Sequence, residues 1–256
     1  MRITILGTGT STGLPMIGCE CAVCTSPDPR DRRLRTSALI ETDNGNILID
    51  AGPDMRQQLL ASGVQSLHGV VLTHEHQDHI GGIDDLRPLN YRMNAAITMY
   101  GLPRTLSAIQ ERYHYAFSLS SGGSSRPNVT LAPITAWQEF TVAEMSIMPL
   151  PITHGSLEIL GYRIGKLAYI TDASHISHEV CRAIHGVDTL IINALRDEPH
   201  PMHLSFNQAL QYITTIAPRR AYLVHLTHGV RHADLLPRLP AHVQPAYDGL
   251  MIEVPA

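Results

Sequence analysis

The feature that most constrains this chain is the segment at residues 73–79, Thr-His-Glu-His-Gln-Asp-His, directly after the apolar run Gly-Val-Val-Leu at 69–72. It places His74, His76, Asp78 and His79 within six residues. Imidazole and carboxylate are common ligands of zinc and other first-row divalent metals. The apolar run is typical of a buried strand, and the Gly-Gly at 81–82 is typical of a turn. The segment predicts a metal centre held on a rigid base, and the alternative is a histidine-rich loop that binds nothing.

Three more potential ligands each follow a short strand-like stretch. His154 follows residues 148–153, Asp172 follows 167–171 and His225 follows 221–224. A chance scatter of histidines would not favour strand exits. These positions therefore favour a metal centre built at the ends of several strands.

This arrangement resembles the metallo-β-lactamase superfamily, whose pattern is T-H-x-H-x-D-H followed by a lone His, a lone Asp and a late His at strand ends. The resemblance covers residues 3–254, and Asp50-Ala51-Gly52 fits the family's supporting Asp-x-Gly. It implies two divalent cations, manganese or zinc. It implies a first site of His74, His76 and His154, a second of Asp78, His79 and His225, and Asp172 as the bridge between them.

The same resemblance implies an α/β fold in which one domain spans residues 1–256. In this four-layer αββα sandwich, two mixed β-sheets pack face to face with helices on the outer faces. The order of elements agrees, because strand-like segments outnumber helical ones and the helices fall between strand clusters. Helices are expected at 54–61, 103–113, 177–184 and 205–216. Strands are expected near 3–6, 37–41, 46–50, 68–73, 97–100, 140–148, 160–164, 167–171, 188–193, 220–225 and 250–254.

A second cluster of potential ligands lies near the start of the chain, where Cys19, Cys21 and Cys24 form C-x-C-x-x-C. Thiolates this close suit a tetrahedral structural zinc, which needs a fourth ligand. The remaining cysteine, Cys181, lies in a helix-like stretch and is assigned to the core. His228, three residues after His225, is the best fourth ligand. The alternatives are a disulfide or free thiols, although three clustered cysteines cannot all pair.

This cluster follows the loop Gly-Thr-Gly-Thr-Ser-Thr-Gly at 7–13. The combination looks like the cyclic-phosphate phosphodiesterase of the carbon–phosphorus lyase pathway. That resemblance implies hydrolysis of a small phosphate ester of a cyclic ribosyl type. It implies manganese at the catalytic pair, zinc at the cysteines, and a homodimer. It also implies catalytic roles for Asp78 and for the non-ligand His203. The alternatives are a tRNA 3′-processing endonuclease and a cofactor-biosynthesis oxidoreductase similar to pyrroloquinoline quinone protein B.

Two other segments have functional and structural interpretations. The basic run Arg30, Arg32, Arg33 and Arg35 either supplies a ligand for substrate phosphate or is a solvated loop. The Ser- and Gly-rich stretch 118–128 is either a lid over the site or a surface loop. The loop at 7–13 lacks the G-x-G-x-x-G spacing of a dinucleotide site, so its glycines are expected to allow a tight backbone turn beside the metals.

Composition narrows the choice of partners. The formal net charge is −4 and aromatic residues make up 5%, so neither a basic footprint nor a stacking platform for nucleic acid is expected. No apolar run approaches the ~18 residues of a membrane helix. The start of the chain is typical of a strand rather than a signal peptide. A cytoplasmic location with reduced thiols is therefore expected.

Overall fold

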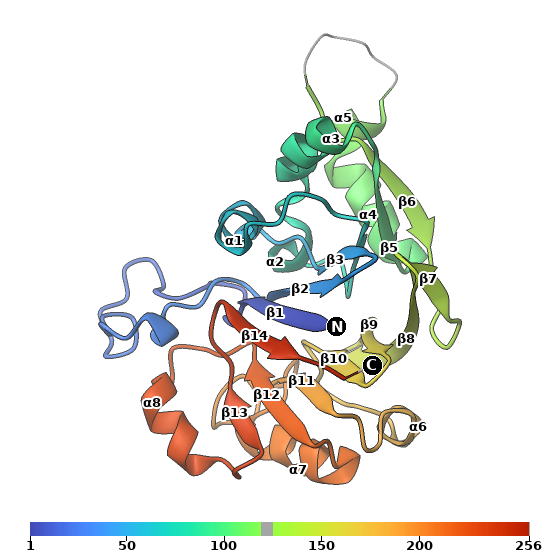
Figure 1. Cartoon of the computed structure of the whole chain (residues 1–256). Coiled ribbons are helices and arrows are strands. Elements are labelled where there is room, and N and C mark those ends of the chain that lie inside the picture. Colours follow the sequence, from blue (N-terminus) through green and yellow to red (C-terminus); the bar gives the residue numbers. More distant parts are fainter. Residues whose placement is uncertain (119–124, 256) are drawn as a thin grey trace.

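The computed structural model describes residues 1–118 and 125–255 of the 256-residue chain. Two seven-stranded mixed sheets form its centre (Figure 1). In spatial order, the first sheet contains β14 (Leu250–Glu253), β1 (Arg2–Gly7), β2 (Ser37–Thr42), β3 (Gly45–Ile49), β4 (Gly69–Val71), β5 (Ile97–Gly101) and β6 (Val129–Pro133). The second contains β13 (Val243–Pro245), β12 (Arg220–Val224), β11 (Thr189–Asn193), β10 (Leu167–Ile170), β9 (Leu157–Ile164), β8 (Met145–His154) and β7 (Phe140–Val142).

Helices lie on the outer sides of the paired sheets. Figure 1 shows the first five on one side and the last three on the other. Those on the first side are α1 (Met55–Ser62), α2 (Gln77–Ile80), α3 (Arg87–Met93), α4 (Pro103–Arg112) and α5 (His114–Phe117). Those on the other side are α6 (His178–Ala183), α7 (Phe206–Ile216) and α8 (His232–Leu235). Short 3-10 turns occur at Pro29–Asp31, Ile83–Leu86 and Leu236–Arg238.

Three groups of buried apolar side chains hold these four layers together. The middle group, with Ile5, Ile40 and Ile191 among its members, joins strands of both sheets and fills the space between them. A second group packs the first sheet against α1 and α4, and a third packs the second sheet against α6 and α7. Burial of apolar surface is the main stabilising term in such a core. The expected αββα sandwich is therefore confirmed.

The start of α7 is fixed by its own sequence. Ser205 accepts a hydrogen bond from the backbone N–H of Gln208, and the Gln208 side chain accepts one from the Ser205 N–H. This reciprocal capping box satisfies two backbone donors that a helix start leaves free. It ends the preceding loop at a defined point, which matters because that loop contains His203.

The sequence located most elements but misjudged several short ones. The single strand expected at 140–148 is wrong, because Ala143 and Glu144 adopt positive φ (47° and 60°) and form a turn between β7 and β8. Strands β6 and β13 were missed; each lies at a sheet edge and ends in proline. The helices α2, α3, α5 and α8 were missed, and all are seven residues or shorter. Of the stretch 118–128, residues 119–124 lie outside the described residues, as does the lid interpretation.

Candidate metal centre

The predicted imidazole and carboxylate ligands meet between the two sheets, at one end of the strands. His74, His76, Asp78 and His79 follow β4 of the first sheet. The second sheet contributes three residues: His154 ends β8, Asp172 follows β10 and His225 follows β12. Because β10, β11 and β12 run parallel, their carboxyl ends lie at the same edge and bring Asp172 and His225 together. We call these seven residues the catalytic cluster.

Three residues at this edge have an unusual backbone conformation. Asp50, Asp172 and His225 have φ values of 61°, 57° and 58°. The left-handed region is uncommon for residues other than glycine and costs free energy, so it tends to persist at functional sites where the surrounding fold enforces it. Each residue directly follows a strand or lies one position beyond it, so the turn redirects its side chain toward the cluster.

The catalytic cluster divides into two sets that share one carboxylate. The ligand atoms of His74, His76 and His154 lie within 4.8 Å of one another, as do those of Asp78, His79 and His225. Asp172 faces both sets. Its ligand atom lies within 4.8 Å of those of His74 and His154 in the first set, and its Oδ2 and Oδ1 each lie 3.3 Å from Nε2 of His79 and His225, respectively, in the second. Donor atoms at such spacings can surround a metal ion at the usual bond lengths of ~2.0–2.2 Å. The residues present therefore fit two cations with Asp172 between them.

Hydrogen bonds to the far side of each ring orient the imidazoles. Four rings use Nδ1 for a contact outside the cluster: His74 with Thr73 Oγ1 at 3.0 Å, His79 with Asp50 Oδ2 at 2.7 Å, His154 with the Met202 carbonyl at 2.8 Å, and His225 with Thr36 Oγ1 at 3.3 Å. Such contacts fix the tautomer of a metal-binding imidazole and raise its basicity. They leave Nε2 facing the cluster, and His79 Nε2 is buried without a hydrogen-bond partner. A cation would satisfy that nitrogen.

The electrostatics of the cluster also suit a cation. Burial lowers the pKa of His74 and His225, so both rings are held neutral and can coordinate. Burial opposes charge on Asp172 as well, but His225 and His79 outweigh it and hold the pKa of that carboxyl well below its usual range. Burial also opposes charge on His79, but the carboxylates of Asp78, Asp172 and Asp50 outweigh it and raise the pKa of that ring. A cation bound there would take the place of that proton, since neutral imidazoles and ionised carboxylates are the forms that bind divalent metals.

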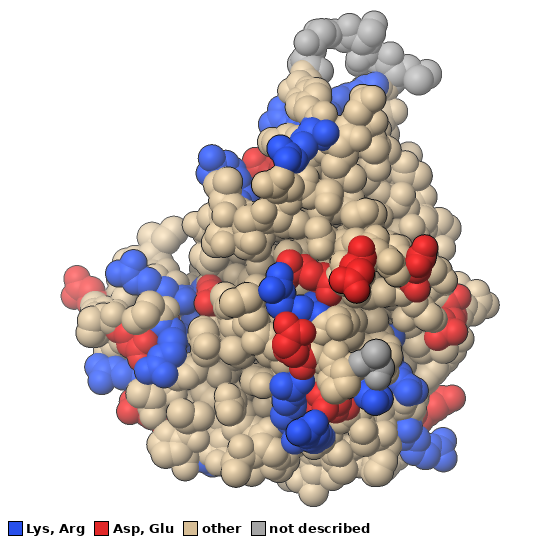
Figure 2. Space-filling view, in the orientation of Figure 1, with Lys and Arg blue, Asp and Glu red and all other residues tan. Residues whose placement is uncertain are grey.

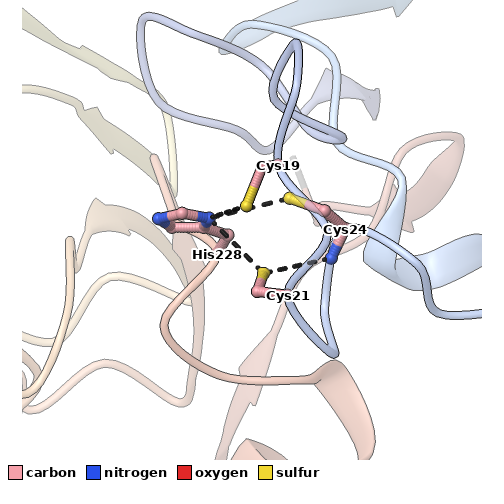
Figure 3. Close-up of side chains that lie close together, drawn as sticks. All are labelled: Cys19, Cys21, Cys24 and His228. Carbon is pink, nitrogen blue, oxygen red and sulfur yellow. Dashed lines mark hydrogen bonds between the residues drawn. The ribbon is translucent and has the colours of Figure 1, made fainter.

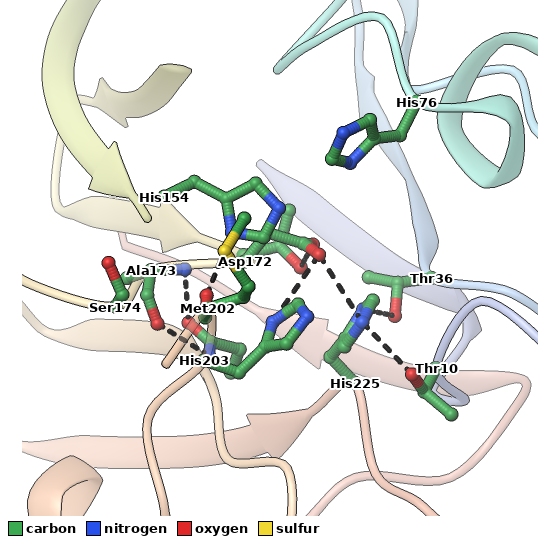
Figure 4. A network of polar contacts seen from close by, with 12 residues as sticks. Thr10, Thr36, His76, His154, Asp172, Ala173, Ser174, Met202, His203 and His225 are labelled. Atoms are coloured by element: carbon green, nitrogen blue, oxygen red, sulfur yellow. Dashed lines mark hydrogen bonds and ion pairs between the residues drawn. The ribbon is translucent and has the colours of Figure 1, made fainter. Parts of the chain in front are cut away.

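His203 lies beside the catalytic cluster in the loop before α7 (Figure 4). Its ring centre is 4.8 Å from that of His225 and 4.9 Å from that of His154. Its Nδ1 is buried without a hydrogen-bond partner, 3.6 Å from Asp172 Oδ1. Burial lowers the pKa of His203 to about 3. The metal-binding atoms of His203, His154 and Asp172 also lie within 4.8 Å of one another, so metal content must distinguish a ligand from a non-ligand role.

The cysteine cluster is a separate site, in the segment between β1 and β2 that projects from the sheets (Figure 1). The Sγ atoms of Cys19, Cys21 and Cys24 lie 3.3, 3.5 and 3.6 Å from Nδ1 of His228 (Figure 3). Three sulfurs and one nitrogen converging on one point fit a tetrahedral structural zinc. Cys181 is buried in the core group that packs on α6, as expected.

The basic run does not face the catalytic cluster as a group. Arg33 is fully buried and donates to the carbonyls of Thr227 and Val230 at 2.7 and 2.9 Å, on either side of His228. Arg33 is therefore excluded from the arginines of the run that could hold a substrate phosphate, because its side chain is fully buried. Arg30 pairs with Asp28 at 2.8 Å, and Arg35 pairs with Asp54 at 3.0 Å. Arg32 is exposed.

Sequence reasoning missed the residues that tie the histidine segment to α4. Glu75 accepts from Arg104 Nε at 2.7 Å and from Thr105 Oγ1 at 3.1 Å, and Gln77 accepts from Arg112 at 3.2 Å. Thus the non-ligand positions of the segment are anchored on the side away from the cluster. The alternation of ligand and non-ligand residues was a visible signal, but the partners lie 29 or more positions away along the chain.

Comparison with known proteins finds a matching family model and solved structures that share this fold. Residues 45–226 match the family model of the beta-lactamase superfamily domain. A crystal structure of a new diphosphatase from the PhnP family superimposes with a TM-score of 0.92 at 36% identity, covering 98% of this chain and 97% of that chain. The zinc-bound PqqB of Methylobacterium extorquens shares the fold, with a TM-score of 0.80 at 21% identity, covering 99% and 100% of the two chains.

Two curated relatives bear other names. An octanoyltransferase of Porphyromonas gingivalis is 43% identical over 253 residues, which is 98% of this chain. This chain covers 51% of that protein, about half its length. A coenzyme PQQ synthesis protein B of Methylorubrum populi is 25% identical over 221 residues, covering 75% of this chain and 72% of the relative.

Proposed function

The chain belongs to the beta-lactamase superfamily, and we propose that it is a metal-dependent phosphodiesterase acting on a small phosphate ester of the cyclic ribosyl type. The fold and the 36% identity to a PhnP-family diphosphatase support a phosphodiesterase-type hydrolase. The proposal rests on one observation above all. Seven ligand side chains form two sets that share Asp172, which is the arrangement that a two-metal hydrolase requires.

Each part of the catalytic cluster has a proposed task. His74, His76 and His154 would hold one cation, Asp78, His79 and His225 would hold the other, and Asp172 would serve both. When bound, two such ions supply a nucleophilic hydroxide near neutral pH and offset the negative charge of a phosphodiester. Hydrolysis forms one new P–O bond from water and breaks the P–O bond to the leaving group, which departs with a proton.

His203 is proposed as a catalytic residue without a place in either ligand set. From its position over Asp172 and His225 it either donates the proton to the leaving oxygen or hydrogen bonds to the pentacoordinate transition state. Burial lowers its pKa to about 3, so the ring is neutral before substrate binds, and the acid role requires the negative charge of the substrate to raise that pKa. A positioned general acid contributes ~10²–10⁴-fold in rate. Asp78 acts in catalysis through the second metal site.

The metals are proposed as manganese or zinc in the catalytic cluster and zinc in the cysteine cluster. Imidazole and carboxylate ligands accept either ion, and cellular supply often decides. Thiolates select zinc, and four ligands close the site to substrate, which assigns it to stability.

Among the described residues, no helix has the length and apolar character needed to cross a membrane.

The name octanoyltransferase supplies a second candidate function, because that relative is 43% identical over nearly the whole chain. The name describes a protein about twice as long, so the segment it shares with this chain need not perform acyl transfer.

Nucleic acid is not the proposed substrate. On the face of the molecule drawn in Figure 2, acidic and basic side chains are interspersed and do not form one basic surface.

The experiment is a substrate panel on protein loaded with manganese, and separately with zinc. The panel contains bis(p-nitrophenyl) phosphate, a ribosyl cyclic phosphate, a diphosphate diester, a precursor tRNA, and an octanoyl donor with its acceptor. We expect hydrolysis of the small phosphodiesters, with the cyclic ester preferred, and no activity in Asp172→Asn. Octanoyl transfer without phosphodiester hydrolysis, or activity on the tRNA alone, would overturn the proposal.

A further inference from the structure

The glycine- and threonine-rich loop after β1 lies against the catalytic cluster. Gly9 bridges in parallel fashion to Leu226, the residue after His225, and to Arg35 on its other side. A Cβ at Gly9 would lie 2.6 Å from the Arg33 carbonyl oxygen, so only glycine permits this close approach. The loop is thereby held beside β12 and delivers the next residue, Thr10, to the cluster.

The Thr10 side chain points at the metal-facing nitrogen of His225 (Figure 4). Its Oγ1 lies 3.2 Å from His225 Nε2, the same nitrogen that lies 3.3 Å from Asp172 Oδ1. The other ring nitrogen already contacts Thr36. The Thr10 backbone is fixed, because its N–H donates to the Leu226 carbonyl and its carbonyl accepts from the Gly13 N–H. The hydroxyl therefore has a defined position and is only partly shielded from solvent.

Coordination changes what this hydroxyl can do. A neutral imidazole has one lone pair, and a cation bound to His225 Nε2 uses it. Among residues 1–118 and 125–255, His225 is the one hydrogen-bond partner of Thr10 Oγ1. With that acceptor occupied, the hydroxyl proton is available to a ligand in the space in front of His225 and Asp172.

We infer that Thr10 is a catalytic residue whose hydroxyl donates a hydrogen bond to a non-bridging phosphoryl oxygen of the substrate. This inference rests on the proposed function. Negative charge grows on those oxygens as a phosphodiester is attacked, and a donor fixed in advance stabilises the transition state more than the ground state. A neutral hydroxyl suits this position, because the ligand atoms of Asp78, His79 and His225 already crowd within 4.8 Å of one another beside it.

The test compares Thr10→Val, which removes the hydroxyl and keeps the branched shape, with Thr10→Ser, which keeps the hydroxyl. Thr12→Val is the matched control, since Thr12 is exposed on the same loop. Removing one donor of this kind costs roughly 10²-fold in kcat. We expect that loss in Thr10→Val on bis(p-nitrophenyl) phosphate, substantial recovery in Thr10→Ser, and wild-type rates in Thr12→Val. KM should change by less than about threefold, because the contact strengthens only in the transition state.

Two measurements without turnover complete the test. Metal content should be equal in all four proteins, and orthovanadate, an oxyanion that adopts pentacoordinate geometry, should bind more weakly to Thr10→Val by calorimetry. Loss of metal from Thr10→Val would overturn the inference and make the hydroxyl a support for His225. Equal vanadate affinity in wild type and Thr10→Val would also overturn it. If the wild type hydrolyses no phosphodiester, the proposed function fails, and the vanadate comparison still decides whether the Thr10 hydroxyl binds a phosphoryl-like oxyanion.

Discussion

The catalytic cluster and the cysteine cluster are joined by four residues, His225 to His228, yet the chain builds them differently. In the catalytic cluster, His74, His79, Asp172 and His225 are each at most 2% exposed. They lie in segments that follow strands of both sheets, and His79 is on the short helix α2. In the cysteine cluster, three ligands lie within one projecting loop, and Cys19, Cys21 and His228 are partly exposed. The first site is shaped by the packed core, and the second has little core around it.

This difference indicates which site depends on a bound metal for its local structure. The imidazoles of the catalytic cluster are oriented by partners such as Asp50 and Met202, which persist without an ion. The thiols have few such supports, so a bound zinc would supply much of the local folding free energy. We therefore expect metal loss to stop chemistry at the first site and to lower stability at the second.

The largest effect is expected from Asp172→Asn. The variant removes the charge that faces His79 and His225 at 3.3 Å but keeps the size of the side chain. Asparagine tolerates the left-handed conformation that Asp172 adopts, so the fold should persist. Phosphodiester hydrolysis should fall below detection, with an unchanged circular dichroism spectrum and a reduced metal content in the catalytic cluster. Full activity would show that the carboxylate does not bridge two metals.

His203→Ala should have the next largest effect, a loss of ~10²–10⁴-fold in kcat with metal content unchanged. An alkyl leaving group needs protonation as its bond breaks, whereas nitrophenolate departs with little help. A larger loss on alkyl esters therefore supports an acid, and equal losses support transition-state stabilisation. His200→Gln is the matched control, because it changes the neighbouring ring, centred 5.3 Å away, and should retain most activity. Loss of a metal from His203→Ala would instead make His203 a ligand.

Cys21→Ala should distinguish the roles of the two clusters most clearly. It should lose one zinc per chain while the catalytic metals stay bound. A loss of even ~3 kcal/mol would lower Tm by roughly 6–12 °C in a chain of this size. Cys181→Ala is the control, since it removes a buried thiol outside the cluster and should keep all metals. If Cys21→Ala keeps its zinc, or if a Cys21–Cys24 disulfide forms without added oxidant, the zinc assignment fails.

The sequence predicts that the side chains of the catalytic cluster meet, because their positions along the chain obey local rules. His154 and His225 each terminate or follow an apolar strand, and parallel neighbours end at one edge, so strand-exit positions converge. His228 could also be predicted from the sequence, because it follows His225 by three positions and a tetrahedral zinc bound by three cysteines needs a fourth ligand. The resemblance to a family supplied the pairing of ligands with metals, which spacing alone does not give.

Other parts of the site depend on distant contacts that carry no local pattern. Thr36 supports His225 from 189 positions away, and the Met202 carbonyl supports His154 from 48. A threonine hydroxyl or a backbone carbonyl looks the same at any position of a sequence. The burial of Arg33 was not predicted for a related reason. The basic run suggests an exposed patch, but the carbonyls that bury its guanidinium come from residues nearly 200 positions later.

The smallest effect is expected where the two regions adjoin, at Asp248. Its carboxylate accepts from Thr8 Oγ1 and from the Leu34 N–H, both at 2.7 Å, and so joins the loop of Thr10 to the segment after the cysteine cluster. Burial raises the pKa of Asp248 to about 7, above the usual 3.8, despite these donors. Between those values the folded chain holds a proton that the unfolded chain has released.

The sign follows from that difference in bound protons. Because the folded state binds more protons, the free energy of unfolding falls as pH rises through this window, by at most ~1.4 kcal/mol per pH unit. Asp248→Asn cannot ionise, so urea unfolding of the metal-loaded variant between about pH 5 and about pH 8 should lack this contribution to the slope. Asp43→Asn, at an exposed turn, should retain the wild-type slope. An identical slope in wild type and Asp248→Asn would mean that Asp248 is already ionised in the folded chain. The two regions would then be joined by a charged contact, and raising the pH through neutrality would leave that contact intact.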